Sequence, residues 1–518
     1  MRVRELPPDC KPWSPAYFPG RLETATERLR ECVQDRVDPH GALRDPCDSR
    51  VLESALLLRL LERTGHTPAA RAGLVTFLGA HREATDPLDR LLVSAALDGQ
   101  AAVAPELADH FLAQVPDFTA HRKRRMIDAL LTLFGSEPPA EALAQTEAFS
   151  TVGLHSWAAV QVTALKVIMA GAAKRMALVR PGDIELLSST QRTLWVWEGN
   201  LLLHLSVLHA LTEIPGTDHV IQQGIGKALA HQRSDGGIPF TCDTDTWCTA
   251  TGGVALAAAG AGRDDLAQLA RHLTTQQRPN GGWAVTDVAQ QTDVDDTSVT
   301  LEFLHQLDPH KYADAIAQAT ASLLGVRDAP GGFPTYVAGA PAEACMTAAA
   351  VNALSTDPGR HRTAIAQGLT FLAEQQNQDG SFPPDWSSSR HHTLFRAVLA
   401  VGSLGPEPPE AARRMGARAL DAIREVQNDD GGWGQQPGDP SDAISTSYGL
   451  IALCRQSDPA PAIRGVEWLL ARQRPNGHMD SVSDSIGPRP FIFTVPALGD
   501  IFPLLALGHL RHRLESSS

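Results

Sequence analysis

Residues 275–285 read "TQQRPNGGWAV", and related stretches recur through the second half of the chain. The other copies read "AHQRSDGGIPF" (230–240), "VRDAPGGFPTY" (326–336), "EQQNQDGSFPPDW" (374–386), "VQNDDGGWGQQ" (426–436) and "RQRPNGHMDS" (472–481). Each copy follows an Ala- and Leu-rich segment of helical period, and its glycine permits the positive φ with which a helix often ends. Self-similarity of this kind indicates a repeat architecture.

Successive copies lie about 50 residues apart, which accommodates two helices and their connections in each repeat. The copy at 326–336 has lost the glutamine that marks the others. Six helical hairpins arranged in a ring predict a closed α/α barrel. Within each turn, the Gln amide can hydrogen-bond to backbone ends and stack on the indole, so we interpret Trp283, Trp433 and their glutamines as structural residues.

The first half of the chain is also helical by pattern. The stretches "DSRVLESALLLRLLERTG" (48–65) and "RKRRMIDALLTLFG" (122–135) show amphipathic spacing and end on glycine. Long alternating Val-rich runs are missing, which argues against an extended sheet. We therefore predict an all-α protein with two helical domains. These are residues 1–212, whose first helix is a candidate to pack on the barrel, and residues 213–518, which form an α/α6 barrel.

Charge and cysteine content restrict the functional class. The chain has 45 Lys plus Arg against 59 Asp plus Glu, a net charge of −14, which disfavours nucleic acid as a partner. The seven cysteines are scattered without CxxC pairs, which is typical of free thiols in a reducing compartment. The sequence shows neither an export signal nor a long apolar run. We expect a cytoplasmic protein without a transmembrane segment; its oligomeric state stays open.

Residues 290–301 read "QQTDVDDTSVTL" and place Asp293, Asp295 and Asp296 within four positions. Like charges this close are costly if all are ionised in a sheltered site, so one carboxyl is a candidate to stay protonated. A carboxyl that is neutral near pH 7 is a potential acid. The simpler alternative is that Asp295 or Asp296 only caps the helix that follows.

Set among these turns, Asp293-Val294-Asp295-Asp296-Thr297 resembles the DxDD acid motif of class II terpene cyclases, which start cyclisation by protonation. The resemblance covers residues 225–515 well and the N-terminal half only by its helical character and size. It implies a βγ architecture with the cavity between the two domains, Asp295 as proton donor, and Asp293 and Asp296 as supporting carboxyls. An alkene is a very weak base, so its acid must be protonated, desolvated and aimed at one carbon.

A protonated prenyl chain passes through carbocations, which aromatic faces stabilise while excluding water. Several aromatic residues follow the barrel turns or lie in the closing segment, and each of them is also typical of an ordinary core. The aromatic candidates for substrate binding are Trp247, Phe333, Tyr336, Tyr448, Phe491 and Phe493.

Basic residues after the late turns favour a diphosphate substrate over a neutral one. The segments 387–398 and 484–493 place Arg390, Arg396 and Arg489 there, and planar guanidinium groups suit bidentate binding of diphosphate. Surface ion pairs are the alternative for each of them. The sequence lacks the DDxxD motif of enzymes that ionise a diphosphate, so the product is expected to keep it.

The resemblance also implies that Mg²⁺ assists diphosphate binding. Asp45, Asp48, Glu53 and Glu198 could hold the ion, but nothing in the sequence ranks them, and the metal ligands stay unknown.

The closing segments "GDPSDAISTSYGL" (438–450) and "GPRPFIFTVPALGDIFPLLALGHL" (487–510) resemble actinobacterial cyclases of the drimenyl diphosphate type. This resemblance implies that farnesyl diphosphate is folded into a bicyclic drimane-type product. Geranylgeranyl diphosphate, cyclised as in the copalyl diphosphate enzymes, is the alternative substrate, and squalene or a meroterpenoid is a more distant one. The sequence does not determine product stereochemistry or the group that ends the cation cascade.

Three other classes share features of this pattern. Protein prenyltransferase subunits have the same toroid but need zinc, and Asp245 and Cys248 have the wrong spacing for that site. Glycan-processing toroids need two carboxylates across a groove rather than a packed triplet. A non-catalytic helical scaffold would have no use for the triplet.

Overall fold

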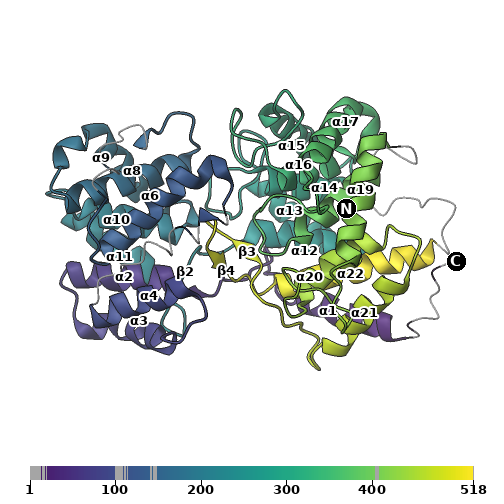
Figure 1. The fold of residues 1–518 in the computed structure, drawn as a ribbon, viewed down its shortest axis with the longest axis horizontal. Helices are drawn as coiled ribbons and strands as arrows, with labels where there is room; N and C mark the ends of the chain where they lie inside the picture. The colour runs from purple at the N-terminus through teal and green to yellow at the C-terminus, as the bar shows by residue number, and fades with distance from the viewer. Residues whose placement is uncertain are drawn as a thin grey trace. The chain divides into compact units, whose positions relative to one another are not determined.

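The computed structural model describes residues 13, 18, 20–99, 109, 112–113, 115–139, 143, 149–402 and 408–516. These residues are mostly helical, so the predicted all-α fold is confirmed (Figure 1). Contacts divide the chain into a barrel unit (Met1–Asp45, Thr244–Ser485 and Thr494–Ser518) and a helical unit (Pro46–Asp243 and Ile486–Phe493). In the part of the chain described, no helix combines the length and apolar character needed to cross a membrane.

The barrel unit is built from two concentric rings of helices. The inner ring consists of α12 (Asp245–Ala258), α14 (Val294–Leu307), α16 (Ala344–Leu354), α18 (His391–Val401), α20 (Ala443–Leu453) and α22 (Leu498–Glu515). Each inner helix contacts the next, and α22 contacts α12, so the ring closes. The outer ring consists of α13 (Arg263–Gln276), α15 (Ala313–Val326), α17 (Pro358–Gln375), α19 (Glu410–Arg424), α21 (Ala460–Arg472) and α1 (Arg21–Gln34). The predicted α/α6 barrel is therefore present.

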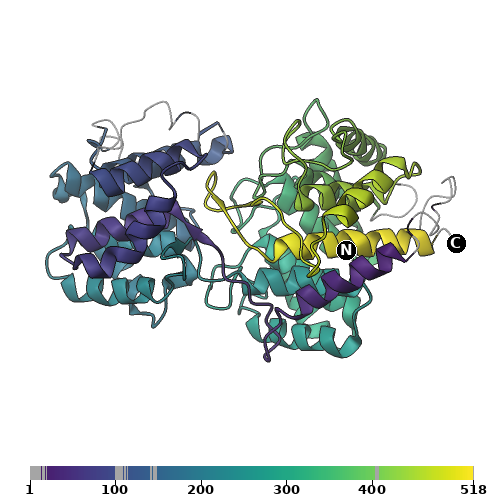
Figure 2. The same ribbon diagram turned by 90° about the horizontal axis from the view of Figure 1, so that it is seen from below.

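The outer ring is completed by the N-terminal helix α1. This helix packs against α22, which comes from the other end of the chain, and both views show the two side by side (Figures 1 and 2). The Gln473 side chain donates a hydrogen bond to Ala25 O at 3.0 Å. Gln277 makes the equivalent bond to Ala315 O of α15, also at 3.0 Å. The contact that joins each repeat to the next outer helix is therefore also made between the last repeat and the N-terminal helix α1.

The recurring turns fasten each hairpin to its neighbour by the same set of bonds. The Gln277 amide donates to Gly281 O at 2.8 Å as well as to α15. The Trp283 indole donates to Leu273 O at 2.7 Å, and the Trp283 backbone N–H donates to Thr297 Oγ1 at 3.0 Å. Gln427 and Trp433 repeat this pattern three repeats later in the sequence. The turns therefore have a structural role.

Gly281 lies in this turn with φ +85°, and a Cβ atom there would approach Gln318 O to 2.4 Å. We expect Gly281→Ala to lower the free energy of unfolding by about 3 kcal/mol, because both the backbone strain and the clash with a backbone oxygen must be relieved. Gly339 has φ +81° but no atom within 4 Å of the added Cβ. Gly339→Ala should cost only about 1 kcal/mol. Chemical denaturation of both variants checks this, and equal losses would contradict a clamping role for the turn.

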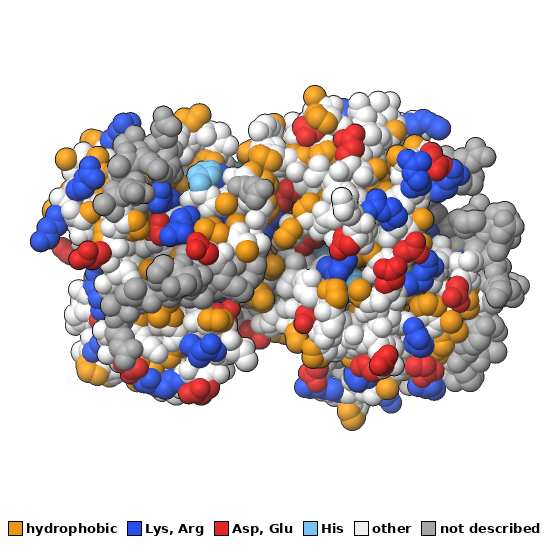
Figure 3. All heavy atoms as spheres, viewed as in Figure 1, with side chains coloured by type: hydrophobic (Ala, Val, Ile, Leu, Met, Phe, Trp, Pro, Cys, Tyr) orange, Lys and Arg blue, Asp and Glu red, His pale blue; other side chains and the backbone are white. Residues whose placement is uncertain are grey.

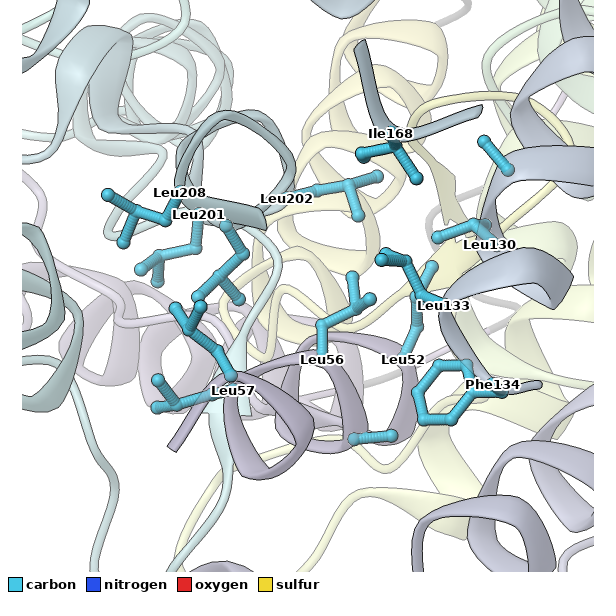
Figure 4. Close-up of a cluster of buried hydrophobic side chains, with 14 of the residues drawn as sticks. Leu52, Leu56, Leu57, Leu130, Leu133, Phe134, Ile168, Leu201, Leu202 and Leu208 are labelled. Carbon is cyan, nitrogen blue, oxygen red and sulfur yellow. The ribbon is translucent and has the colours of Figure 1, made fainter. Parts of the chain in front are cut away.

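The helical unit packs its helices around a leucine-rich core. Its α-helices are α2 (Val51–Arg63), α3 (Pro68–Ala80), α4 (Pro87–Asp98), α6 (Asp117–Leu133), α8 (Ser156–Ala172), α9 (Pro181–Ser189), α10 (Leu201–Leu211) and α11 (Asp218–Leu229). Figure 4 shows Leu56, Leu130, Ile168 and Leu202 converging from α2, α6, α8 and α10. Burial of side chains like these, each stabilising by about 1.5–3 kcal/mol, holds the unit together.

Short elements complete the helical unit. They are the 3₁₀ turns η3 (Met176–Leu178), η4 (Thr190–Arg192) and η5 (Trp197–Gly199), and two pairs of very short strands. β1 (Ser49–Arg50) pairs antiparallel with β2 (Ile238–Pro239), with Ser49 opposite Pro239. β3 (Ser485–Ile486) pairs with β4 (Ile492–Phe493).

The observed division differs from the boundary at residue 212 that the sequence pattern suggested. Residues 213–243 belong to the helical unit, because α11 packs on α10 and α2 and because β2 pairs with β1. The copy of the turn at 230–240 therefore lies outside the barrel. Helix α1, which lies within residues 1–212, belongs to the barrel unit, where it is the sixth outer helix.

Candidate active site

The acidic triplet lies at the start of inner helix α14. Asp293 is the N-cap, and its carboxylate accepts the Asp296 backbone N–H at 2.8 Å, so the cap is neither Asp295 nor Asp296. Asp293 N–H donates to Trp283 O at 3.1 Å, and the Thr297 hydroxyl donates to Asp293 O at 2.6 Å. Because Thr297 also accepts from the Trp283 N–H, the turn and the acidic segment are held in one arrangement.

Two of the three carboxyls have a raised pKa. Burial raises the pKa of Asp293 to about 6, although a hydrogen bond with Asp296 opposes the shift. Burial and the neighbouring Asp293 carboxyl raise the pKa of Asp296 well above its usual range. The Asp296 side chain is 4% exposed, and its Oδ1 atom has no hydrogen-bond partner among the described residues. The pair therefore keeps a proton to higher pH than a free aspartate does.

Asp295 has a different environment from the other two. Its carboxylate accepts a hydrogen bond of 2.6 Å from Arg396 of α18, a residue 101 positions further along the chain. The Asp295 and Arg396 side chains are only 15% and 5% exposed. Burial works to lower the pKa of Arg396, but the Asp295 carboxylate outweighs it and the pKa is raised. The Arg396 guanidinium carbon also lies 6.0 Å from the ring centres of Trp247 and Phe395.

A small cavity lies inside the barrel beside this ion pair. Its volume is about 30 Å³, enough for a few water molecules. Polar side chains from the four inner helices α12, α14, α16 and α18 contribute to its wall together with apolar ones. The lining residues are Thr251, Val254, Asp295, Ser298, Val299, Glu302, Ala349, Asn352, Arg396, Phe502 and Leu505.

The other aromatic candidates of the barrel unit have separate environments. Phe333 is fully buried, and its N–H donates to Thr347 Oγ1 at 2.9 Å, as Trp283 does to Thr297. Phe333 is thus the turn aromatic of its repeat, and we no longer assign it to substrate. Tyr336 is half-buried and meets the Trp386 ring edge-on at 6.0 Å.

Tyr448 is buried on α20 in a network of aromatic and acidic groups. Its ring stacks on Phe395 at 4.9 Å and meets the edge of the cavity-lining Phe502 at 4.8 Å. Its hydroxyl donates to Asp484 at 2.8 Å. Burial raises the pKa of both Tyr448 and Asp484. Tyr448 therefore adjoins the acid site through Phe395 and Phe502.

The predicted basic residues fall into three separate environments. Arg396 forms an ion pair with Asp295, so the Asp295 carboxylate already balances its charge. Arg390 sits at the N-cap of α18 and donates to the exposed Asp379 at 3.3 Å. Arg489 is buried in the helical unit, as is Phe491, whose ring centre is 6.0 Å from the Arg50 guanidinium carbon.

Arg489 belongs to a group of cationic side chains that the sequence reasoning missed. Burial, with Arg489 and Arg122 nearby, lowers the pKa of Lys123 to about 7. Burial, with Arg122 and Lys123 nearby, lowers the pKa of His155 to about 3. Among the described residues, Arg122 and Lys123 form no ion pair, whereas the next residue, Arg124, pairs with Asp128. We call Arg122, Lys123, His155 and Arg489 the basic cluster. The run "RKRR" was its only sequence signal.

The residues suggested for magnesium do not form a metal site. Asp45 pairs with Arg36, Glu53 pairs with Arg50, and the Glu198 carboxylate accepts the Trp157 indole N–H at 2.8 Å. Within the described ranges, no three His, Cys, Asp or Glu side chains are grouped as metal ligands would be. No residue is therefore assigned to magnesium, and no step is assigned to the metal.

Two family descriptions each match part of the chain. The Squalene-hopene cyclase C-terminal domain matches residues 339–512, and the Prenyltransferase alpha-alpha toroid domain matches residues 201–383. Both matches fall largely on the ring of helices that carries the acidic triplet.

Two curated relatives match almost from end to end. The chain is 40% identical over 522 residues to drimenyl diphosphate synthase of Streptantibioticus cattleyicolor, which covers 95% of this chain and 96% of the relative. It is 36% identical over 528 residues to drimenyl diphosphate synthase of Streptomyces showdoensis, which covers 98% of both chains. Among solved structures, ent-copalyl diphosphate synthase from Streptomyces platensis has a similar fold, with a TM-score of 0.58 and 19% identity over 94% of this chain and 99% of that one.

Proposed function

Since the chain belongs to the drimenyl diphosphate synthase family of class II terpene cyclases, we propose that it protonates the terminal alkene of a linear prenyl diphosphate, preferably farnesyl diphosphate. Ring closure then gives a bicyclic drimane-type product that keeps its diphosphate. The observation that carries this proposal is the acidic triplet on α14, in which a pair of carboxyls with raised pKa adjoins the Asp295–Arg396 ion pair.

In this proposal Asp295 is the proton donor. Burial and Asp293 favour the neutral form of Asp296, and the Arg396 guanidinium is the positive charge next to Asp295. A cation stabilises the carboxylate that remains after transfer and so makes protonated Asp295 a stronger acid, as the weak basicity of an alkene requires. Binding of a hydrocarbon chain removes water from Asp295, which favours its protonated form beforehand.

The reaction adds one proton to the substrate and removes one, so it needs no other reactant. The Asp295 O–H bond breaks as a C–H bond forms at the terminal alkene, and the cation moves along the chain as the ring bonds form. Loss of a proton from carbon next to the last cation restores a double bond. The indole of Trp247, close to Arg396, is the aromatic face that we assign to the cationic intermediates in this region.

The diphosphate of the substrate is assigned to the basic cluster of the helical unit. Lys123 and Arg489 are close enough for each cation to raise the free energy of the other, and a diphosphate would relieve this repulsion. Because the pKa of Lys123 is about 7, its positive charge is partly lost as the pH rises through 7. Affinity for the anionic substrate should fall over the same range.

We expect Lys123→Gln and Arg489→Gln each to raise KM for farnesyl diphosphate by about tenfold while kcat changes little, because each variant loses a charge-assisted bond to the diphosphate. In Lys123→Gln, the rise of KM between pH 6 and 8 should also disappear. Arg124→Gln is the matched control, since Arg124 is adjacent in sequence but already paired with Asp128. Steady-state kinetics at several pH values give these values, and an unchanged KM in both variants would remove the basic cluster from the substrate site.

Magnesium is proposed only as an ion that accompanies the diphosphate, and kinetics with and without a chelator would show whether it is needed. A cytoplasmic location is likewise proposed. It is supported by the seven cysteines of the sequence, which are scattered without CxxC pairs; Cys10 lies outside the described residues. A small-molecule substrate rather than nucleic acid agrees with the face drawn in Figure 3, where acidic and basic side chains of the barrel unit are interspersed.

The proposed function is tested by incubating the purified protein with farnesyl diphosphate, geranylgeranyl diphosphate or squalene and analysing extracts by mass spectrometry before and after phosphatase treatment. We expect a bicyclic alcohol from farnesyl diphosphate that is seen only after phosphatase. A cyclic product from geranylgeranyl diphosphate alone would change the assigned chain length. A hydrocarbon seen without phosphatase would contradict retention of the diphosphate.

A further inference from the structure

We propose that Glu302 returns a proton to Asp295 after each turnover, through water held in the cavity between them. The inference rests on the proposed function, because it assigns the source of the proton that Asp295 donates. It adds a residue that is not part of the acidic triplet and that reaches the reacting atoms only through Asp295.

Helix α14 carries the proton donor, a hydroxyl and the proposed proton source on one face. Asp295, Ser298 and Glu302 are separated by three and then four positions, so they lie on the same face of the helix. All three line the cavity of about 30 Å³ inside the barrel. At a rise of about 1.5 Å per residue, Glu302 begins about 10 Å along the helix from Asp295, too far for direct transfer. One or two water molecules span such a gap.

The polar part of the cavity wall is suited to hold that water. Ser298 is 1% exposed, and its hydroxyl has no hydrogen-bond partner among the described residues. A buried hydroxyl without a partner costs about 1–3 kcal/mol, and a water molecule in the cavity removes this cost. Asn352 adds a second polar group, whose amide donates to Arg396 O at 3.2 Å. The rest of the wall is apolar, which confines the water to the polar side; its residues are Val254, Val299, Ala349, Phe502 and Leu505.

A separate proton supply solves a problem that the reaction creates. Each cyclisation removes the proton from Asp295, and the product loses its own proton from a different carbon. Water on the substrate side of Asp295 would quench the carbocations. Glu302 lies two turns further along α14, within the barrel, and can therefore recharge the acid without admitting water to the substrate.

The relay step conserves protons and charge. The O–H bond of the Glu302 carboxyl breaks as its proton passes to a cavity water, and that water gives another of its protons to the Asp295 carboxylate. Asp295 is then neutral and Glu302 is a carboxylate, which takes a proton from solvent before the next cycle. The ion pair with Arg396 re-forms whenever Asp295 is ionised.

The test compares the first turnover with the following ones in Glu302→Gln. We expect the single-turnover rate with enzyme in excess to stay within about twofold of wild type, because the first turnover does not need the proton that Glu302 returns. Steady-state turnover should fall at least about tenfold, giving a burst of product followed by a slow phase. The slow phase should show a larger solvent isotope effect in D₂O than wild-type turnover does.

Ser298→Ala tests the water path independently of Glu302, and we expect a smaller burst effect of the same form. Thr300→Val is the matched control, because Thr300 is another buried hydroxyl of α14 without a partner in the described part of the chain, but it does not line the cavity. Equal losses in both kinetic regimes for Glu302→Gln would indicate a structural role and overturn the relay, as would unchanged steady-state turnover. Failure of wild-type enzyme to form a cyclic product in either regime would instead refute the proposed function.

Discussion

Replacing Asp295 by asparagine should reduce cyclisation of farnesyl diphosphate by about a thousandfold or more, because the amide cannot donate an acidic proton to an alkene. The substitution keeps the shape of the side chain and an oxygen that can accept the hydrogen bond from Arg396. We therefore expect the fold to persist, with the free energy of unfolding lower by about 1–3 kcal/mol. Product analysis after phosphatase gives the rate, and chemical denaturation gives the stability.

Asp287→Asn is the matched control for this variant. Asp287 lies in the loop just before the triplet, where it pairs with Arg44 at 3.0 Å and is 27% exposed at the side chain. It should retain wild-type activity. Substantial cyclisation by Asp295→Asn would mean that Asp296 or Asp293 is the donor, and the role of Asp295 would then be wrong.

Replacing Arg396 by glutamine should lower kcat by about a hundredfold, since one pKa unit of acid strength is worth about tenfold in equilibrium and the guanidinium stabilises the carboxylate that Asp295 leaves behind. The pH profile gives a more specific signature. Activity needs the protonated acid, so it falls as the pH rises through the pKa of the triplet, and the pKa of Asp293 is raised to about 6. Without the cation the carboxyls hold their protons more tightly, and the fall should move to higher pH while the maximal rate drops.

Arg513→Gln separates this effect from simple loss of a buried cation. The Arg513 guanidinium is also buried in the barrel unit, where it donates to Gln456 O at 2.9 Å and lies 5.3 Å from the Trp13 ring centre. We expect this variant to lose stability, and its pH profile should keep the wild-type midpoint. If Arg396→Gln lowers activity with an unshifted pH profile, Arg396 acts only on folding and our account of the acid is wrong.

Local sequence signals were sufficient to predict most of the barrel. The recurring Gln and Gly turns have the same structural role. The side chain of Gln277, for example, donates one hydrogen bond within its own turn and one to the next outer helix. The sixth outer helix could not be derived in the same way. Helix α1 is about two hundred residues from the first inner helix, and no turn of the repeated kind precedes it. Its packing on α22 and the hydrogen bond from Gln473 to Ala25 O show where it belongs.

The site was predictable to the extent that its residues are neighbours in sequence. Asp293, Asp295 and Asp296 lie within four positions, so the sequence shows their grouping directly. Arg396 looked like a diphosphate ligand, because its pairing with Asp295 depends on which inner helices are neighbours across 101 positions. Phe333 looked like a cavity residue although its alignment with Trp283 in the repeat already indicated a turn role.

Lys123 and Glu302 were missed for opposite reasons. The run "RKRR" that contains Lys123 is typical of a solvated helix face, and only the approach of Arg489 and His155 in the helical unit makes it a basic cluster. Glu302 carries a usable signal, its spacing of seven from Asp295, but the spacing alone does not reveal a cavity.

The most direct test of protonation-initiated cyclisation is the mass of the product formed from farnesyl diphosphate in D₂O. The account predicts that the acid exchanges its proton with solvent and delivers one deuterium to the former terminal alkene, so the dephosphorylated bicyclic product should be one mass unit heavier than the product formed in H₂O. A bicyclic product without deuterium, or a deuterium-free hydrocarbon that has lost the diphosphate, would show that cyclisation begins in another way and would contradict the assignment of Asp295.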